Sequence, residues 1–218
     1  PDGMGDYFNE KGIWLGSDGK NDNKVFAAQN VSKSKSGLVN DAKNAKLLNI
    51  SYDKFVRQAS AVYGESSAYL VRNKKDEPSD EMMKEMYAIA SVHQRNSKAY
   101  GVNSEPAKDF RKKGESQRNE LPLMRTAIAA EINALFGGTD YSYGATMWDG
   151  AEQAQFSSND MRRSTGRFEI HMNTMGWKIS DGHYAKWKKN VGKSFKAPQI
   201  RIAPTHFNDG KRNMNAGK

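Results

Sequence analysis

The stretch SYDKFVRQASAVYGESS, residues 51–67, is the part of the sequence from which we predict the fold. Its apolar residues recur at the spacing of one face of an α-helix. These are Phe55, Ala59, Val62 and Tyr63. Ser51 is a suitable N-cap, and Asp53 lies in the first turn, where an acidic side chain stabilises a helix. We therefore expect a helix that runs into Gly64-Glu65-Ser66-Ser67.

Two more helices are predicted by the same spacing. One begins at Pro78-Ser79-Asp80-Glu81, and its apolar face consists of Met82, Met83, Met86, Ile89, Ala90 and His93. The other follows Pro122, and its stripe consists of Met124, Ala127, Ile128, Ile132 and Leu135. Gly137-Gly138 is a typical helix stop. The centre of the chain is thus predicted to be helical.

The remaining segments predict only small β-structure. Residues 6–19 alternate short apolar pairs with turn residues, and residues 25–27 form one more short strand. Residues 29–46 are polar and have no clear period, so we interpret them as a linker. We expect a mainly α fold with small β elements near the N-terminus and around 166–180. The predicted domains are 1–48, a short β segment with a polar linker, and 49–218, a catalytic domain with a basic end.

Composition excludes several classes of protein. The 218 residues contain no cysteine, which rules out disulfides, thiolate metal sites and cysteine nucleophiles. No apolar run approaches the roughly 18 residues that span a bilayer, so we expect no membrane insertion. Pro1 to Glu10 is mostly polar and lacks the apolar centre of a signal peptide.

Positive charge is concentrated in the last quarter of the chain. The net charge is +9, and residues 161–218 hold 13 Lys and Arg against three acidic residues. Such a segment predicts an anionic partner, which can be nucleic acid, an acidic polymer of the cell envelope or an acidic protein. We expect wall polymer or an acidic protein, and not nucleic acid.

Glu65 is the candidate catalytic residue. Cleavage of a glycosidic bond needs a carboxylic acid that is still protonated near neutral pH, because the departing sugar alkoxide is too basic to leave unaided. Burial against apolar groups raises the pKa of a Glu above its ordinary value of about 4.3. Glu65 falls where an apolar helix gives way to a loop, which is a suitable place for such an acid. The alternative is a solvated Glu at a helix end.

A second candidate segment is the loop at residues 137–150, GGTDYSYGATMWDG. It combines turn-forming residues with three aromatic side chains. That composition is suited to stacking on sugar rings and to hydrogen bonds with their hydroxyl groups. The alternative is a packed loop whose aromatic side chains close the core.

Three blocks resemble the SleB-type cell-wall hydrolases: YGESS at 63–67, MYAIASVHQRN at 86–96 and DYSYGATMW at 140–148. The resemblance implies a lysozyme-like fold and cleavage of peptidoglycan, as a lytic transglycosylase or a muramidase, without a cofactor. It implies that Glu65 is the catalytic acid. The substrate-binding residues would be Ser66, Ser142, Tyr143, Gly144, Ala145 and Trp148. The chain departs from the family pattern at Tyr69, where a second Glu is usual, and at Arg95-Asn96, which reverses the usual order.

The ends of the chain resemble modules of type VI secretion effectors of Bacteroidetes. The residues concerned are 6–19 and 165–177. This resemblance implies an antibacterial toxin that a dedicated secretion system delivers and that acts in the periplasm of a target bacterium. It also implies a cognate immunity protein.

Other functions stay open at this point. His171, Asn173 and His183, with the basic end of the chain, superficially resemble the site of a metal-dependent nuclease. A non-catalytic cell-wall binding module is another alternative. Transglycosylation can use one Glu as acid and then as base, whereas an inverting hydrolase needs a second carboxylate. The candidates for that second group are Asp140, Asp149 and Glu152.

Overall fold

Two units make up the part of the chain that the computed structural model describes, namely residues 4–71, 73–96, 104–145, 147–150, 200–202 and 205–208. The first unit is Pro1–Tyr143 and the second is Gly144–Lys218. Each is described here by itself. Among the described residues, none of the helices combines the length and the apolar character that crossing a membrane requires.

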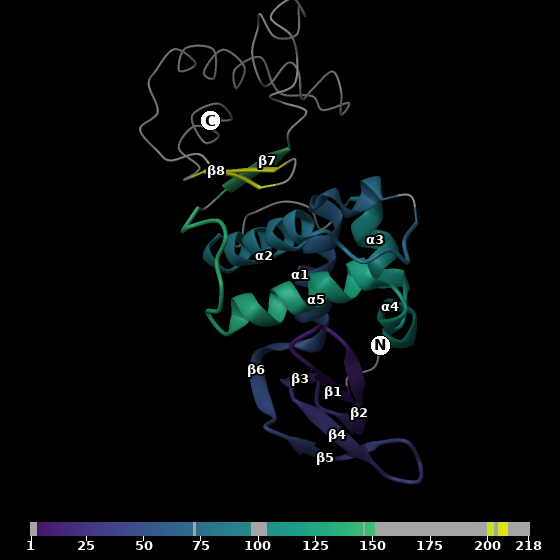
Figure 1. Ribbon diagram of the computed structural model, residues 1–218. Coiled ribbons are helices and arrows are strands. Elements are labelled where there is room, and N and C mark those ends of the chain that lie inside the picture. Colours follow the sequence, from purple (N-terminus) through teal and green to yellow (C-terminus); the bar gives the residue numbers. More distant parts are fainter. Residues whose placement is uncertain are drawn as a thin grey trace, which may run out of the picture. The chain divides into compact units, whose positions relative to one another are not determined.

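A four-stranded mixed sheet occupies one side of the first unit (Figure 1). Its strands, in spatial order, are β2 (Trp14–Asn21), β1 (Met4–Phe8), β3 (Lys24–Ala27) and β6 (Lys46–Ser51). β1 pairs parallel with β3, and the two other pairings are antiparallel. Phe8, Val25 and Leu48 are buried on one face of the sheet, as alternation along a strand requires.

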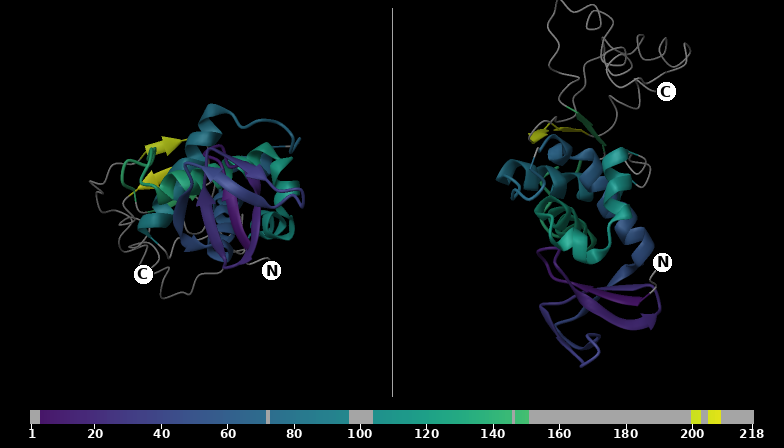
Figure 2. Two further views of the ribbon diagram at one scale, coloured as in Figure 1. Left: turned by 90° about the horizontal axis from the view of Figure 1, so that it is seen from below. Right: turned by 90° about the vertical axis from the view of Figure 1, so that its right-hand side faces the viewer.

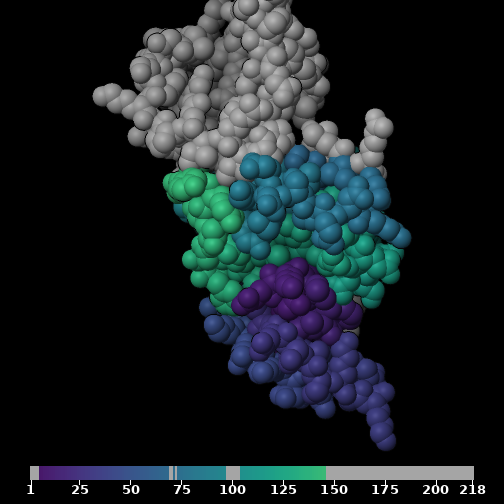
Figure 3. All heavy atoms as spheres, in the orientation of Figure 1, coloured from purple at the N-terminus to yellow at the C-terminus, as the bar shows by residue number. Residues whose placement is uncertain are grey.

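A second, two-stranded sheet is formed by β4 (Asn30–Lys33) and β5 (Val39–Lys43). The space-filling view shows this part of the chain projecting from the first unit (Figure 3). Most of its side chains are exposed on both faces, so the strands have no alternating apolar pattern. The interpretation of residues 29–46 as a linker was wrong, because β4 and β5 pair there without the alternating apolar pattern on which the prediction of strands depends. The prediction of a mainly α fold was wrong as well, because the structure has a mixed α/β fold.

The five α-helices among the described residues lie together on one side of the four-stranded sheet (Figures 1 and 2), and α1, α4 and α5 contact its strands. They are α1 (Tyr52–Glu65), α2 (Asp80–Arg95), α3 (Glu105–Lys112), α4 (Glu115–Asn119) and α5 (Pro122–Leu135), and the short 3-10 helix η1 (Ser67–Leu70) follows α1. The three helices predicted from periodicity are confirmed. Ser79 caps α2 through its side chain, whereas Ser51, the predicted N-cap of α1, makes no side-chain cap bond.

The sheet and the helices share one core. The ring of Phe8 lies 5.3 Å from that of Phe55 on α1, and both side chains are fully buried. Gly12 has a φ of +74°, and a Cβ atom there would lie 1.9 Å from the carbonyl oxygen of Arg125. Only glycine therefore allows the turn between β1 and β2 to lie against α5.

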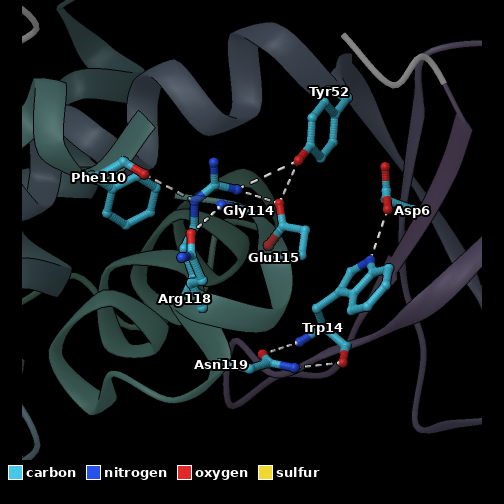
Figure 4. A network of polar contacts seen from close by, with 9 residues as sticks. Asp6, Trp14, Tyr52, Phe110, Gly114, Glu115, Arg118 and Asn119 are labelled. Atoms are coloured by element: carbon cyan, nitrogen blue, oxygen red, sulfur yellow. Dashed lines mark hydrogen bonds and ion pairs between the residues drawn. The ribbon is translucent and has the colours of Figure 1, made fainter. Parts of the chain in front are cut away.

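A polar network also connects the sheet to the helices (Figure 4). The side chain of Asn119 accepts from the backbone N–H of Trp14 at 2.8 Å and donates to its carbonyl oxygen at 2.9 Å. Nearby, the hydroxyl of Tyr52 donates to Glu115 at 2.5 Å, and Arg118 is paired with the same carboxylate. Burial raises the pKa of Glu115 although Arg118 and Tyr52 oppose the shift.

Asn119→Ala is expected to lower the free energy of unfolding by about 2 kcal/mol, because two partly buried backbone groups of Trp14 lose their partners. Urea unfolding at neutral pH measures this. Asn49→Ala, at an exposed position of β6, serves as the control and should stay within about 0.5 kcal/mol of the parent. Equal stabilities of the two variants would show that the Asn119 contact contributes nothing.

The second unit contains a three-stranded antiparallel sheet in the order β7 (Met147–Gly150), β9 (Thr205–Asn208) and β8 (Ile200–Ile202). Trp148 pairs with Phe207 through the backbone. The β elements predicted around 166–180 lie outside the described residues, and so does the segment 161–218 apart from β8 and β9.

Candidate functional site

Glu65 is the last residue of α1 and the one partly exposed residue in a buried run. From residue 59 to residue 68, every other residue is buried. Glu65 also takes part in a polar or electrostatic interaction. Glu65 thus places a carboxyl group at the surface, on a segment whose other residues are buried in the core.

Gly64 determines how closely α3 approaches the end of α1. A Cβ atom at Gly64 would lie 2.4 Å from Oγ of Ser104 and 2.9 Å from Cβ of Ala107. Ser104 is the N-cap of α3, and its Oγ accepts from the backbone N–H of Ala107 at 3.4 Å. Tyr63 contacts the same helix, with its ring 5.7 Å from that of Phe110. The glycine beside Glu65 therefore serves helix packing.

Two serines fix the turn that follows Glu65. Oγ of Ser66 donates to the carbonyl oxygen of Tyr63 at 2.9 Å. The backbone N–H and the hydroxyl of Ser67 both donate to Oε2 of Glu85, at 2.8 and 2.6 Å. Glu85 lies on α2 and is fully buried. Ser66 was predicted to bind substrate, but its buried hydroxyl makes contacts within the turn.

The loop at residues 138–143 is held by the C-terminal parts of two helices. Arg95 of α2 donates to Oδ2 of Asp140 at 2.8 Å and also to the hydroxyl of Ser142. The hydroxyl of Ser142 in turn donates to Oδ1 of Asp140 at 2.6 Å. Asn133 of α5 accepts from the N–H of Thr139 and donates to its carbonyl oxygen. Hydrogen bonds from side chains of α2, of α5 and of the loop itself thus give the loop a defined conformation.

The aromatic residues of this loop differ in their surroundings. Tyr143 is 76% exposed and has a φ of +50°. Tyr141 packs edge-on against Tyr87 of α2, with ring centroids 6.2 Å apart. Gly144 is exposed with a φ of +83°, and Ala145 is buried. The side chain of Trp148 lies outside the described residues, so its predicted place near Glu65 stays a prediction.

The two residues of α2 that hold these segments are ten positions apart. Glu85 fixes the turn after Glu65, and Arg95 fixes the loop at 138–143. At 1.5 Å per residue these two anchor points lie about 15 Å apart along the helix. In Figure 1 the chain that leaves α5 passes one end of α2, whereas α3 lies at the other. Glu85 and Arg95 thus anchor the turn after Glu65 and the loop at 138–143 at different points of α2.

Arg95→Ala is expected to release this loop while leaving the fold intact. Amide exchange at residues 139–142 should become about tenfold faster, and the free energy of unfolding should change by at most about 1 kcal/mol, because the ion pair is partly exposed. Hydrogen exchange with mass spectrometry measures the first, and urea unfolding measures the second. Lys108→Ala, which removes another partly exposed ion pair, is the control. Unchanged exchange at 139–142 would show that Arg95 does not hold the loop.

Glu131 is a second buried carboxyl group that the sequence analysis missed. It lies on α5 and is fully buried. Its Oε1 accepts from Gln94 at 2.7 Å, and its Oε2 has no hydrogen-bond partner among the described residues. Burial raises the pKa of Glu131 to about 8, although the bond from Gln94 and the positive charge of Lys54 oppose this. The carboxyl group is therefore largely neutral at pH 7.

No protein-family model, curated protein or solved structure matches the chain. The likeness to SleB-type hydrolases thus rests on the three sequence blocks alone. His171, Asn173, His183 and Glu152 lie outside the described residues, and only the backbone of Asp149 is described.

Proposed function

We propose that the chain cleaves the glycan strands of peptidoglycan and that Glu65 is the general acid. The observation that carries the proposal is the partial exposure of Glu65 within the buried run 59–68. A general acid must reach the leaving oxygen and yet be held in one place. Glu65 meets both conditions, since the residues on either side of it are fixed by α2 and α3.

In the proposed reaction, the carboxyl group of Glu65 donates its proton to the glycosidic oxygen as the bond to the anomeric carbon breaks. The carboxylate that results can then accept a proton, either from a hydroxyl of the sugar itself or from water. Asp140 is a poor candidate for a second catalytic carboxylate, because both of its oxygens already accept hydrogen bonds, from Arg95 and from Ser142. One carboxyl group in two successive roles is the simplest scheme that the described residues support.

The loop at 138–143 is a second candidate contact for a glycan. Tyr143 is an exposed aromatic ring on a fixed loop, which is a typical platform for a sugar ring. Delivery as a toxin, action in the periplasm and a cognate immunity protein belong to the same proposal and follow from the resemblance of the chain ends to secreted effectors.

Mass spectrometry of purified peptidoglycan after incubation with the full chain tests the proposal. We expect soluble glycan fragments that keep their peptide stems. Anhydro ends would indicate transglycosylation, and reducing ends would indicate hydrolysis, and either result supports glycan cleavage. Intact glycan, or cut peptide stems on intact glycan, would contradict it. Cleavage of DNA in the presence of a divalent metal, with intact glycan, would favour the nuclease alternative.

A further inference from the structure

The buried side chain of Glu85 has no role in the proposed reaction as described so far, and its contacts are unusual for a core position. It lies on α2 next to Met86 and is fully buried. A single oxygen, Oε2, accepts both hydrogen bonds that Ser67 donates, at 2.8 and 2.6 Å. Ser67 is the second residue after Glu65.

Glu85 places an ionisable group in the core beside the turn that follows Glu65. Removing an ionisable group from water is unfavourable by several kcal/mol unless hydrogen bonds compensate. Through Oε2, Glu85 accepts from two donor atoms of Ser67 and so joins the turn after Glu65 to α2 twice. An amide at this position would put an NH2 donor in place of one carboxyl oxygen.

The position of this connection matters for Glu65. Before Glu65 in the chain, Gly64 lies against the start of α3, and after Glu65, Ser67 is bound to Glu85. Ser66, between Glu65 and Ser67, is bound to the carbonyl oxygen of Tyr63. The backbone of Glu65 is thus held on both sides. General acid catalysis depends on placement within about 0.5 Å.

We propose that Glu85 is a positioning residue that holds the backbone of Glu65 in its proton-donating place through the two hydrogen bonds from Ser67. The inference rests on the proposed function of Glu65. Glu85 itself does not touch the substrate, because it is fully buried.

Steady-state cleavage of soluble, uncross-linked glycan strands by the full chain tests the proposal. Glu85→Gln is expected to lower kcat about tenfold with little change in KM, because binding elsewhere on the glycan is unaffected. Ser67→Ala should lower kcat in the same way, Ser67→Thr should keep most of it, and the Ser67→Ala/Glu85→Gln double variant should be no worse than Glu85→Gln alone. The matched control is Glu115→Gln. It changes another mostly buried carboxyl group, which binds Tyr52 about 20 Å away at the start of α1, and it should leave kcat unchanged.

Hydrogen exchange at the Ser67 amide gives a readout that does not depend on cleavage. It should become at least tenfold faster in Glu85→Gln and stay unchanged in Glu115→Gln. The proposal is overturned if folded Glu85→Gln keeps the parental kcat, if Ser67 exchange does not change, or if Glu115→Gln lowers kcat equally. A parent chain that cuts no glycan overturns the proposed function together with this role, whereas an active parent with an indifferent Glu85→Gln variant overturns this role alone.

Discussion

Glu65→Gln is expected to reduce the rate of glycan cleavage by about 10²-fold or more while the protein stays folded. The amide keeps the shape of the side chain and its hydrogen-bonding capacity, but it cannot donate a proton to the leaving oxygen. Because the flanking residues are held by α2 and α3, the substitution should not disturb the turn. Release of soluble glycan fragments per unit time measures the effect.

Glu120→Gln is the matched control for this experiment. It makes the same chemical change at an exposed position after α4 and should cleave at the parental rate. Circular dichroism and urea unfolding establish that both variants are folded. If folded Glu65→Gln digests glycan as fast as Glu120→Gln, another carboxyl group is the acid.

The second large effect concerns stability and comes from Glu131. The pKa of its buried carboxyl is raised to about 8, from 4.5 for an ordinary Glu. Between these values the folded state binds more protons than the unfolded state, so the free energy of unfolding falls as pH rises. The contribution of this group is most favourable below pH 4.5, is lost between pH 4.5 and 8, and is constant above. The limiting slope is about 1.4 kcal/mol per pH unit.

Glu131→Gln removes this dependence, since an amide does not titrate. The variant and the parent should be similar in stability near pH 4.5, and the variant should be more stable by roughly 2 kcal/mol or more at pH 8. Urea unfolding at pH 4.5, 6.5 and 8 gives the difference, and Glu120→Gln should follow the parent at every pH. A difference that does not vary with pH would mean that Glu131 has an ordinary pKa in the folded protein.

Periodicity identified the long helices because each buries one stripe of apolar residues. It failed for the β4–β5 hairpin, whose strands are held by backbone hydrogen bonds and expose side chains on both faces. It also failed for α3, which is only eight residues long and buries just Ala107 and Phe110. The error in fold class follows from the missed strands alone, since a pattern of side chains cannot report a ladder of backbone bonds.

The candidate site was predictable only in part. The block around Glu65 predicts that this residue is the acid, and that stays a prediction. The contact between Ser67 and Glu85 joins residues 18 positions apart and has no local signature. A signal was nevertheless present. Glu85 and Glu131 stand at helical spacing from Met82, Ile89, Ile128 and Leu135 on the apolar stripes of their helices. An acidic residue at a core position of such a stripe is an unusual feature that indicates a specific buried contact.

The number of residues between Glu85 and Arg95 on α2 determines in which direction each of these two side chains points. One inserted amino acid between Glu85 and Arg95 would turn their side chains by about 100° relative to one another, since a turn takes 3.6 residues. Either Glu85 would then point away from Ser67, or Arg95 would point away from Asp140. Insertions at the tip of the β4–β5 hairpin, where Gly37 has open space around it, would disturb nothing comparable. Length variation in this protein is thus restricted at α2 and tolerated at the hairpin, which gives protein engineers a site for tags and linkers.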